Sequence, residues 1–512
     1  MQKNLILLLL MVMMAACSGS SNEQAAPSGE KYLPFVDPMI GTGGTGHTFP
    51  GATTPFGMVQ LSPSNEYKSW DYCSGYHYND TIVKGFAHTH ISGPGLSGLG
   101  DILVMPAREA HTSSGEDGKA DSGYRARFSH DNESASAGYY KLLLHEEEVL
   151  VELTAGTRMG YHRYTFNGEG EDYLLFDPNH QINENIQDTY LELISDTELV
   201  GYKDCDGWSA GDRTQYFYAK FSQPVAGFNL VRKGEPVEGN KGSGKGLLGQ
   251  VRFDLAPGES VEVHLALSSI SIEGAKANFE AEAVDGFDLA HENARREWAK
   301  VLSKIEIEGA TDRQMKLFYT GLYHAFISPN LISDADGRYY VEGKVRQSDI
   351  PQYSNFSTWD TYRGLHPLFT IIETEKTAGF VNSLSSRVAV DDVGLPSWEC
   401  LGYDNRCMIG YSAVSPVADA VLKDIPGVDV EAAYEAIRYA AFDRTKHSQV
   451  SDLNGMDEYL KYGYVTAETG VSVSKTTEQN YCDWAIARVA EKLGKTKDQT
   501  LFDRRAIGYR NF

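Results

Sequence analysis

Two short stretches of the sequence place a tryptophan directly before an aspartate. "SWDYCSGYHY" contains Trp70 and Asp71, and "STWDTYRGLHPLF" contains Trp359 and Asp360, followed closely by Arg363. A flat aromatic ring covers the C–H face of a pyranose, and a carboxylate accepts hydrogen bonds from the hydroxyls of the sugar. The two pairs therefore predict a sugar-binding site. A core tryptophan beside an aspartate that caps a helix is the other interpretation, and a single pair leaves it open.

Two histidines stand at strand spacing in "GFAHTHISGPGLSGLGD". His88 and His90 would lie on the same face of a strand. Zinc sites use this spacing, with Asp101 or His77 as the available further ligands. Because no third ligand stands out, we favour polar contacts within a sugar-binding cleft and predict no metal on these residues.

A carboxylate also follows a tryptophan in "LPSWEC", where Glu399 comes after Trp398. Burial against an aromatic ring raises the pKa of a carboxyl group and suits a glycosidase acid, although an ordinary loop salt bridge is the commoner arrangement. The sequence contains no GxSxG motif, phosphate-binding loop or dinucleotide fingerprint, so esterase, kinase and dehydrogenase functions lack support.

The elements that must position these residues change character along the chain. Up to residue 273 the apolar residues alternate as in strands, for example Val149, Val151 and Leu153. From residue 274 a long helix is predicted, with Phe287, Ala294, Trp298 and Leu302 on one face.

A capping box at Thr311 and Gln314 then opens a helical region. A closed ring of six helical hairpins needs roughly 300 residues, and residues 311–512 provide about 200. The predicted fold is multidomain β + α: an antiparallel β-sandwich over residues 31–273, a helical linker over 274–310, and an incomplete six-hairpin α/α barrel over 311–512.

The last residues predict two amphipathic helices. Thr476 with Gln479, and Thr496 with Gln499, have the spacing of capping boxes. The apolar face of the second helix continues to Phe512. Since such a helical hairpin exposes more apolar surface than it covers, we expect a further partner element, and we expect this sequence to be the first part of a longer protein.

The N-terminus resembles the signal of an exported bacterial lipoprotein. Lys3 precedes the apolar run "LILLLLMVMMAA", which is too short to span a membrane. "MAAC" resembles a lipobox, so we expect a signal peptide over residues 1–17, lipidation at Cys17 and a flexible tether over residues 18–30, in the periplasm or on the outer-membrane surface. An ordinary signal peptide with a chance cysteine is the alternative.

Composition excludes several classes of partner. The 46 basic and 70 acidic residues give a net charge of −24, which repels nucleic acid and anionic lipid. Membrane association is therefore expected only through the lipid on Cys17. Five further cysteines at scattered spacings indicate neither a zinc ribbon nor a disulfide scaffold.

Taken together, six stretches in order resemble glycoside hydrolase family 92, the exo-acting bacterial α-mannosidases: "DPMIGTGGTGHTFPGATTPFGMVQLSP", "SWDYCSGYHY", "GFAHTHISGPGLSGLGDI", "STWDTYRGLHPL", "LPSWE" and "CMIGYSAV". The resemblance implies a site between the sandwich and the barrel. It also implies calcium-dependent, inverting hydrolysis of terminal α-mannosides in mannose-containing glycans of the N-glycan or mannan type.

The resemblance also assigns the substrate side of the site. Trp70 matches the platform for the leaving sugar, and Trp359 and Asp360 match part of the pocket for the terminal mannose. His88, His90 and Arg363 match family positions and, like Asp71, are assigned only as residues that line the cleft.

The family's general acid, its base and its calcium-binding acidic motifs lie beyond the stretch that matches Phe512. We therefore assign no catalytic or metal-binding residue and expect weak mannoside binding without turnover. A glycan-binding lipoprotein without chemistry stays open as an alternative. A sandwich-plus-barrel phosphorylase would need a phosphate site, and the acidic balance argues against one.

Overall fold

The computed structural model describes residues 29–119, 122–389, 394–442 and 455–512. The predicted signal peptide, the lipidation site at Cys17 and most of the tether lie outside the described residues. None of the helices in the described ranges is long and apolar enough to cross a membrane.

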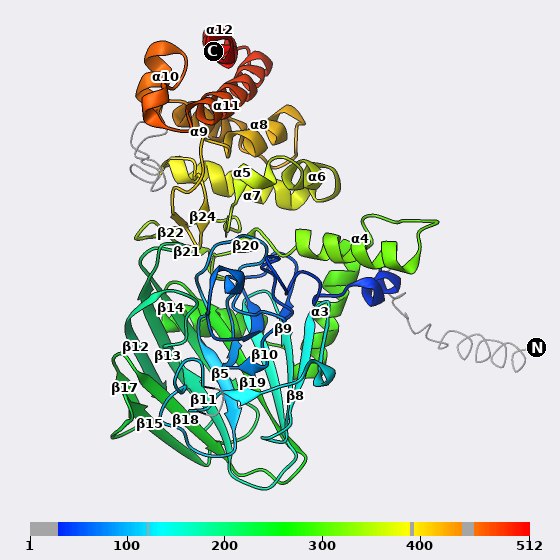
Figure 1. Ribbon diagram of the computed structural model, residues 1–512, viewed down its shortest axis with the longest axis vertical. Helices are drawn as coiled ribbons and strands as arrows, with labels where there is room; N and C mark the ends of the chain where they lie inside the picture. The colour runs from blue at the N-terminus through cyan, green and yellow to red at the C-terminus, as the bar shows by residue number, and fades with distance from the viewer. Residues whose placement is uncertain (1–28, 120–121, 390–393, 443–454) are drawn as a thin grey trace, which may run out of the picture.

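The N-terminal half forms two antiparallel sheets that fill the lower part of Figure 1. The first sheet has eight strands in the order β1 (Ala52–Thr53), β2 (Gln60–Ser64), β4 (Gly85–Ala87), β5 (Leu103–Ala107), β11 (Asp172–Asp177), β18 (Leu247–Phe253), β15 (Gly227–Arg232) and β16 (Glu235–Val237). The second has nine, in the order β17 (Lys241–Ser243), β12 (Asn185–Leu193), β13 (Glu198–Asp206), β14 (Arg213–Phe221), β19 (Glu259–Ser268), β10 (Met159–Phe166), β9 (Val149–Ala155), β8 (Tyr139–Leu144) and β7 (Glu133–Ser136).

The sandwich core lies between these two sheets. Val149, Val151 and Leu153 of β9 are fully buried, while the residues between them are only half-buried. They belong to one apolar cluster with residues of the other sheet, such as Leu174 and Val251. The alternating pattern in the sequence therefore predicted the buried face correctly.

Two helices, α2 (Ile272–Glu282) and α3 (Phe287–Leu302), follow the last long strand. The predicted face of α3 is confirmed, since Phe287, Ala294, Trp298 and Leu302 are all buried. The indole Nε1–H of Trp298 donates to the carbonyl of Thr53 at 2.7 Å, and its ring packs on Tyr323 in helix α4 (Asp312–Ala325). This one side chain ties the sandwich to the helical half.

The C-terminal half is helical and lies above the sandwich in Figure 1. Its helices are α4 (Asp312–Ala325), α5 (Thr358–Thr361), α6 (Leu365–Ile372), α7 (Thr374–Ser386), α8 (Val414–Leu422), α9 (Val430–Ala440), α10 (Met456–Tyr462), α11 (Ser472–Lys492) and α12 (Thr496–Ala506). Three two-stranded sheets pair β20 (Asn330–Leu331) with β23 (Tyr353–Ser354), β21 (Arg338–Val341) with β22 (Lys344–Gln347), and β24 (Glu399–Cys400) with β25 (Tyr403–Asp404). The predicted fold class, a β-sandwich followed by helices, is confirmed.

The capping predictions have mixed outcomes. The box at Thr311 and Gln314 is present with both of its hydrogen bonds. The prediction of a helix start at Thr476 is wrong: α11 already begins at Ser472, and the Thr476 hydroxyl donates to the Ser472 carbonyl inside the helix. At α12 the start is correct to within one residue, but no side chain caps it.

Candidate functional site

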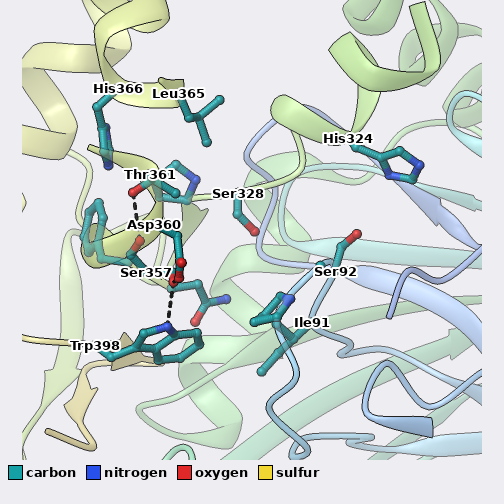
Figure 2. A pocket seen from close by; sticks show the side chains of 15 residues that line it. Ile91, Ser92, His324, Ser328, Ser357, Asp360, Thr361, Leu365, His366 and Trp398 are labelled. Carbon is teal, nitrogen blue, oxygen red and sulfur yellow. Dashed lines mark hydrogen bonds between the residues drawn. The ribbon is translucent and has the colours of Figure 1, made fainter. Parts of the chain in front are cut away.

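A cavity of about 240 Å³ lies where the sandwich meets the helical half. The loop Ile91–Pro94 forms its sandwich wall, and Figure 2 shows the opposite wall, where α5 and α6 contribute Asp360, Thr361, Leu365 and His366. The other lining residues are His324, Ser328, Pro329, Asn355, Phe356, Ser357 and Trp398. Mostly apolar walls with a few polar groups are typical of a small-ligand site.

Asp360 is the carboxylate that lines this cavity among the described residues, and two neighbours fix its position. The indole Nε1–H of Trp398 donates to the Ser357 hydroxyl oxygen at 2.6 Å, and that hydroxyl donates to Asp360 Oδ2 at 2.5 Å. Figure 2 shows the three side chains together on one side of the cavity. The sequence indicated Asp360 but gave no sign that Ser357 and Trp398 would meet.

Trp359 and Arg363 lie beside this cavity rather than in its lining. The Arg363 guanidinium stacks on the rings of Trp359 and Tyr362 and pairs with Glu478 of α11 at 2.9 Å. Burial raises the pKa of Tyr362 to about 12, and the Glu478 carboxylate adds to the effect. The sequence alone did not indicate Glu478, which links the end of α5 to α11.

Trp70 stands one loop away from the cavity and is 54% exposed. Its Nε1–H donates to the carbonyl of Gly95 at 2.9 Å, and its ring meets His47 edge-on at 4.2 Å between centroids. Gly95 follows Pro94 of the cavity wall, so the exposed ring is attached to the loop that lines the cavity. Asp71 is half-buried beside it.

His88 and His90 occupy a different place from the cleft expected for them. Both are fully buried in the sandwich. His90 bonds to Ser64 and to the carbonyl of Gln60, whereas His88 bonds to the carbonyl of Ile102. Burial lowers the pKa of each imidazole to about 4, so both are neutral at pH 7. The spacing of a strand does not apply to this stretch, because β4 ends at Ala87, before either histidine, and both side chains face the protein interior.

His88 also belongs to a directed hydrogen-bond chain. The Ile102 carbonyl only accepts, so His88 Nδ1 carries the proton and His88 Nε2 accepts from His162 Nε2 at 2.9 Å. His162 Nδ1 in turn accepts from the hydroxyl of Tyr164 at 2.8 Å. The imidazole nitrogens of His88 and His162 are therefore all engaged with other protein groups.

Glu399 forms the salt bridge that was the commoner expectation. Its carboxylate accepts two hydrogen bonds from Arg387, from Nε at 2.8 Å and from Nη2 at 3.0 Å. Both side chains are almost completely buried. A carboxylate held in this way is structural.

One group of described side chains has the spacing of a metal site, namely Asp101, Glu184 and Cys205. It does not fit calcium, because Lys203 and Arg213 already neutralise the two carboxylates, with Lys203 Nζ 2.8 Å from Asp101. Burial raises the pKa of the Asp101 carboxyl, but Arg213 and Lys203 outweigh burial and hold it well below its usual value. A hard cation also disfavours a thiol ligand.

Comparison with known families divides the chain into the same two halves that meet at the cavity. The family model of the glycosyl hydrolase family 92 N-terminal domain matches residues 35–268, and that of the family 92 catalytic domain matches residues 274–512. The chain belongs to glycoside hydrolase family 92. The cavity therefore lies where the two domains of family 92 meet.

Solved structures of family 92 share the fold. A family 92 α-mannosidase from Bacteroides thetaiotaomicron, solved alone and with mannoimidazole, is 35% identical with a TM-score of 0.89; for the complex, 94% of this chain and 64% of that chain are covered. An inverting family 92 mannosidase from the same organism is 29% identical, with a TM-score of 0.84 and coverage of 94% and 65%.

A curated relative comes from a fungus. It is an uncharacterized secreted glycosidase of Arthroderma benhamiae, 24% identical over 521 residues, which covers 91% of this chain and 60% of the relative. The chain thus spans less than two thirds of the length of these relatives.

Proposed function

We propose that the protein acts on α-mannosides and holds a terminal mannose in the cavity beside Asp360. The observation that carries this proposal is the oriented carboxylate of Asp360 in an apolar-walled cavity at the junction of the two family 92 domains. Apolar walls suit the C–H faces of a sugar, and a carboxylate accepts from its hydroxyls. Relatives with the same fold are an α-mannosidase and an inverting mannosidase, which supports this substrate class.

Around this cavity we propose separate roles for the sequence-predicted residues. Trp70 is the platform for the leaving sugar, with Asp71 at its edge, because the exposed ring is oriented by Gly95 at the cavity rim. Trp359 and Arg363 shape the rim beside Asp360. His88 and His90 are left out of the contact set, since both are buried in the sandwich and their ring nitrogens are engaged there.

Inverting hydrolysis needs an acid and a base on opposite faces of the sugar, roughly 6.5 to 9.5 Å apart. The described part of the chain places one carboxylate, Asp360, in the lining of this cavity. These residues therefore support substrate binding, and we expect the 512-residue chain to bind mannosides without turning them over. Calcium belongs to the proposal as the ion that holds sugar hydroxyls and favours ring distortion, at a site other than the Asp101 group.

We also propose that the protein is exported and anchored through lipid on Cys17. The lipobox-like "MAAC" supports this proposal, as does the secreted nature of the fungal relative. Metabolic labelling with a fatty acid, comparing the protein with Cys17→Ser, tests it directly.

The experiment for the main proposal separates binding from catalysis. Methyl α-mannoside and a panel of α-mannobioses are titrated into the purified chain by calorimetry, and mannose release is followed with calcium and with a chelator. We expect binding that Asp360→Asn weakens at least tenfold, and no release. Absence of binding by a folded chain refutes the proposed substrate, and calcium-dependent release refutes the proposed division between binding and catalysis.

A glycan-binding lipoprotein without chemistry is the second candidate. The presence of one carboxylate in the described lining favours it. Mannose release by the protein isolated from its native host distinguishes the two, since a binding protein releases none.

A further inference from the structure

The hydrogen-bond direction at the cavity is fixed by groups that can only donate or only accept. The Trp398 indole nitrogen can only donate, so the Ser357 hydroxyl oxygen is an acceptor in that bond. The hydroxyl proton of Ser357 is then directed to Asp360 Oδ2, 2.5 Å away. Ser357 therefore keeps its proton inside the protein, and Asp360 faces the cavity purely as an acceptor.

A second series of hydrogen bonds fixes Ser328 on the opposite side of the cavity. The amide Nδ2 of Asn330 lies 2.9 Å from the carbonyl of Gly57 and 2.8 Å from that of Ile327, and carbonyls only accept. Asn330 Oδ1 must therefore face Ser328, whose hydroxyl donates to it at 3.0 Å. The amide of Asn355 donates to the same oxygen at 2.7 Å. Ser328 is thus also left as an acceptor toward the cavity.

Two more lining residues also donate their hydrogens to groups inside the protein. The Thr361 hydroxyl donates to the carbonyl of Ser357 at 3.0 Å. His324 Nε2 lies 3.1 Å from the carbonyl of Ile40 and must donate to it. Of the hydroxyl protons in the described lining, that of Ser92 is the one without a partner inside the protein. His366 supplies one ring N–H, and Asn355 has a second amide N–H besides the one that it donates to Asn330.

The lining also carries charge of one sign. It includes Asp360 and, among the described residues, no lysine or arginine. The nearby Arg363 is paired with Glu478 and is directed to the rim rather than the cavity. A carboxylate or phosphate on the ligand would find no cation here and would be repelled by Asp360.

We infer that this cavity recognises its ligand as a hydrogen-bond donor: it selects neutral sugars through their hydroxyl protons and rejects sugars that carry a carboxylate or a phosphate. Ser357 and Trp398 are positioning residues that enforce this polarity on Asp360, and Asn330 enforces it on Ser328. The inference rests on the proposed sugar-binding function and adds to it which chemical forms of the sugar are accepted.

Fluorinated sugars test hydrogen-bond direction, because fluorine replaces a hydroxyl without being able to donate. Methyl α-mannoside and its monodeoxy and monodeoxyfluoro analogues are titrated by calorimetry, together with mannose 6-phosphate and the corresponding glucose and galactose series. We expect at least one position at which the deoxy and the fluoro analogues both bind about tenfold or more weakly than the parent. Mannose 6-phosphate should bind at least tenfold more weakly than mannose.

Two variants connect this pattern to Ser357. Ser357→Ala should reduce the penalty of the fluoro analogue at the affected position, because Asp360 is no longer held, and Ser357→Thr should restore it. Ser222→Ala is the control, because Ser222 directly follows β14 and is not in the cavity lining. It removes a hydroxyl that accepts from the backbone N–H of Glu262 and should leave the binding pattern as in the parent protein.

The outcomes separate this inference from the proposed function. Tight binding of the fluoro analogues or of mannose 6-phosphate overturns the inference while mannose binding stands. The same fluorine pattern with glucose or galactose and no mannose binding supports the inference and refutes the mannoside proposal. If no sugar binds to the folded chain, both are refuted.

Discussion

Trp398 and Ser357 are 41 positions apart in the sequence, yet the indole Nε1–H of Trp398 donates to the Ser357 hydroxyl oxygen at 2.6 Å. Trp398 directly precedes strand β24, whereas Ser357 directly precedes helix α5. The bond therefore couples two separate segments of the helical half at the wall of the cavity. The position of the Asp360 carboxylate depends on this coupling, since Ser357 donates to it.

Trp398→Phe tests this coupling. The substitution keeps an aromatic wall but removes the donor, so Ser357 is free to turn away from Asp360. We expect methyl α-mannoside to bind about three- to tenfold more weakly in calorimetry, in the range of one lost hydrogen bond. The exposed Trp208 offers a control: Trp208→Phe should leave the affinity unchanged. Equal affinity of Trp398→Phe and the parent protein would show that the bond does not matter for binding.

Gly95→Ala tests the orientation of the Trp70 platform. A Cβ at Gly95 would lie 2.4 Å from the Trp70 ring, so the ring must move. We expect weaker binding of α-mannobiose, by about the same factor as in Trp70→Ala, and little change for methyl α-mannoside, which does not reach the platform. Gly43→Ala is the matched control, because its Cβ would be 3.6 Å from the Tyr78 side chain, an ordinary contact. A loss that is equal for the two ligands would contradict the platform role.

Local patterns in the sequence predicted local structure well. The period-two alternation of Val149, Val151 and Leu153 gave both the strand and its buried face, and the pairing of Thr311 with Gln314 gave a true capping box. The same capping pattern failed at Thr476 and Gln479, because residues three apart also neighbour each other inside a continuous helix. A local pattern therefore does not identify a helix end without the residues that precede it.

The site was predictable in part for the same reason. Trp359 and Asp360 are adjacent in the sequence, so an aromatic ring and a carboxylate lie near each other in any fold, and the sequence alone could indicate them. The spacing of His88 and His90 suggested one face of a strand, but β4 ends at Ala87, and whether the two rings meet solvent depends on how the rest of the sandwich packs around them. Pairs distant in sequence, such as Ser357 with Trp398 and Arg363 with Glu478, arise only when the helices pack.

Glu399→Gln tests whether Glu399 is structural. The substitution leaves the Arg387 guanidinium buried without its counter-charge, which typically costs about 3–5 kcal/mol. We expect the midpoint of urea unfolding to fall accordingly, while Glu435→Gln on an exposed helix face should change little. An unchanged urea midpoint for Glu399→Gln would instead show that the ion pair with Arg387 does not stabilise the fold.

The dependence of stability on pH should be governed by buried histidines. Burial lowers the pKa of His88, His90 and His366 to about 4, whereas the ordinary value is 6.5. Below pH 6.5 the unfolded chain binds protons that the folded chain excludes. The free energy of unfolding should therefore decrease as the pH falls from 6.5 towards 4, by about 1.4 kcal/mol per pH unit for each such histidine.

His366 isolates one of these contributions. Its ring is buried among Phe356, Phe369 and Phe380, and among the described residues it makes no hydrogen bond that a substitution would break. His366→Phe should thus be more stable than the parent at pH 5, with a slope between pH 6.5 and 4 that is smaller by about one proton. Urea unfolding at half-unit pH intervals measures this slope, and His145→Gln, at an exposed position, should follow the parent curve. Parallel curves for His366→Phe and the parent would mean that His366 is not held neutral by burial.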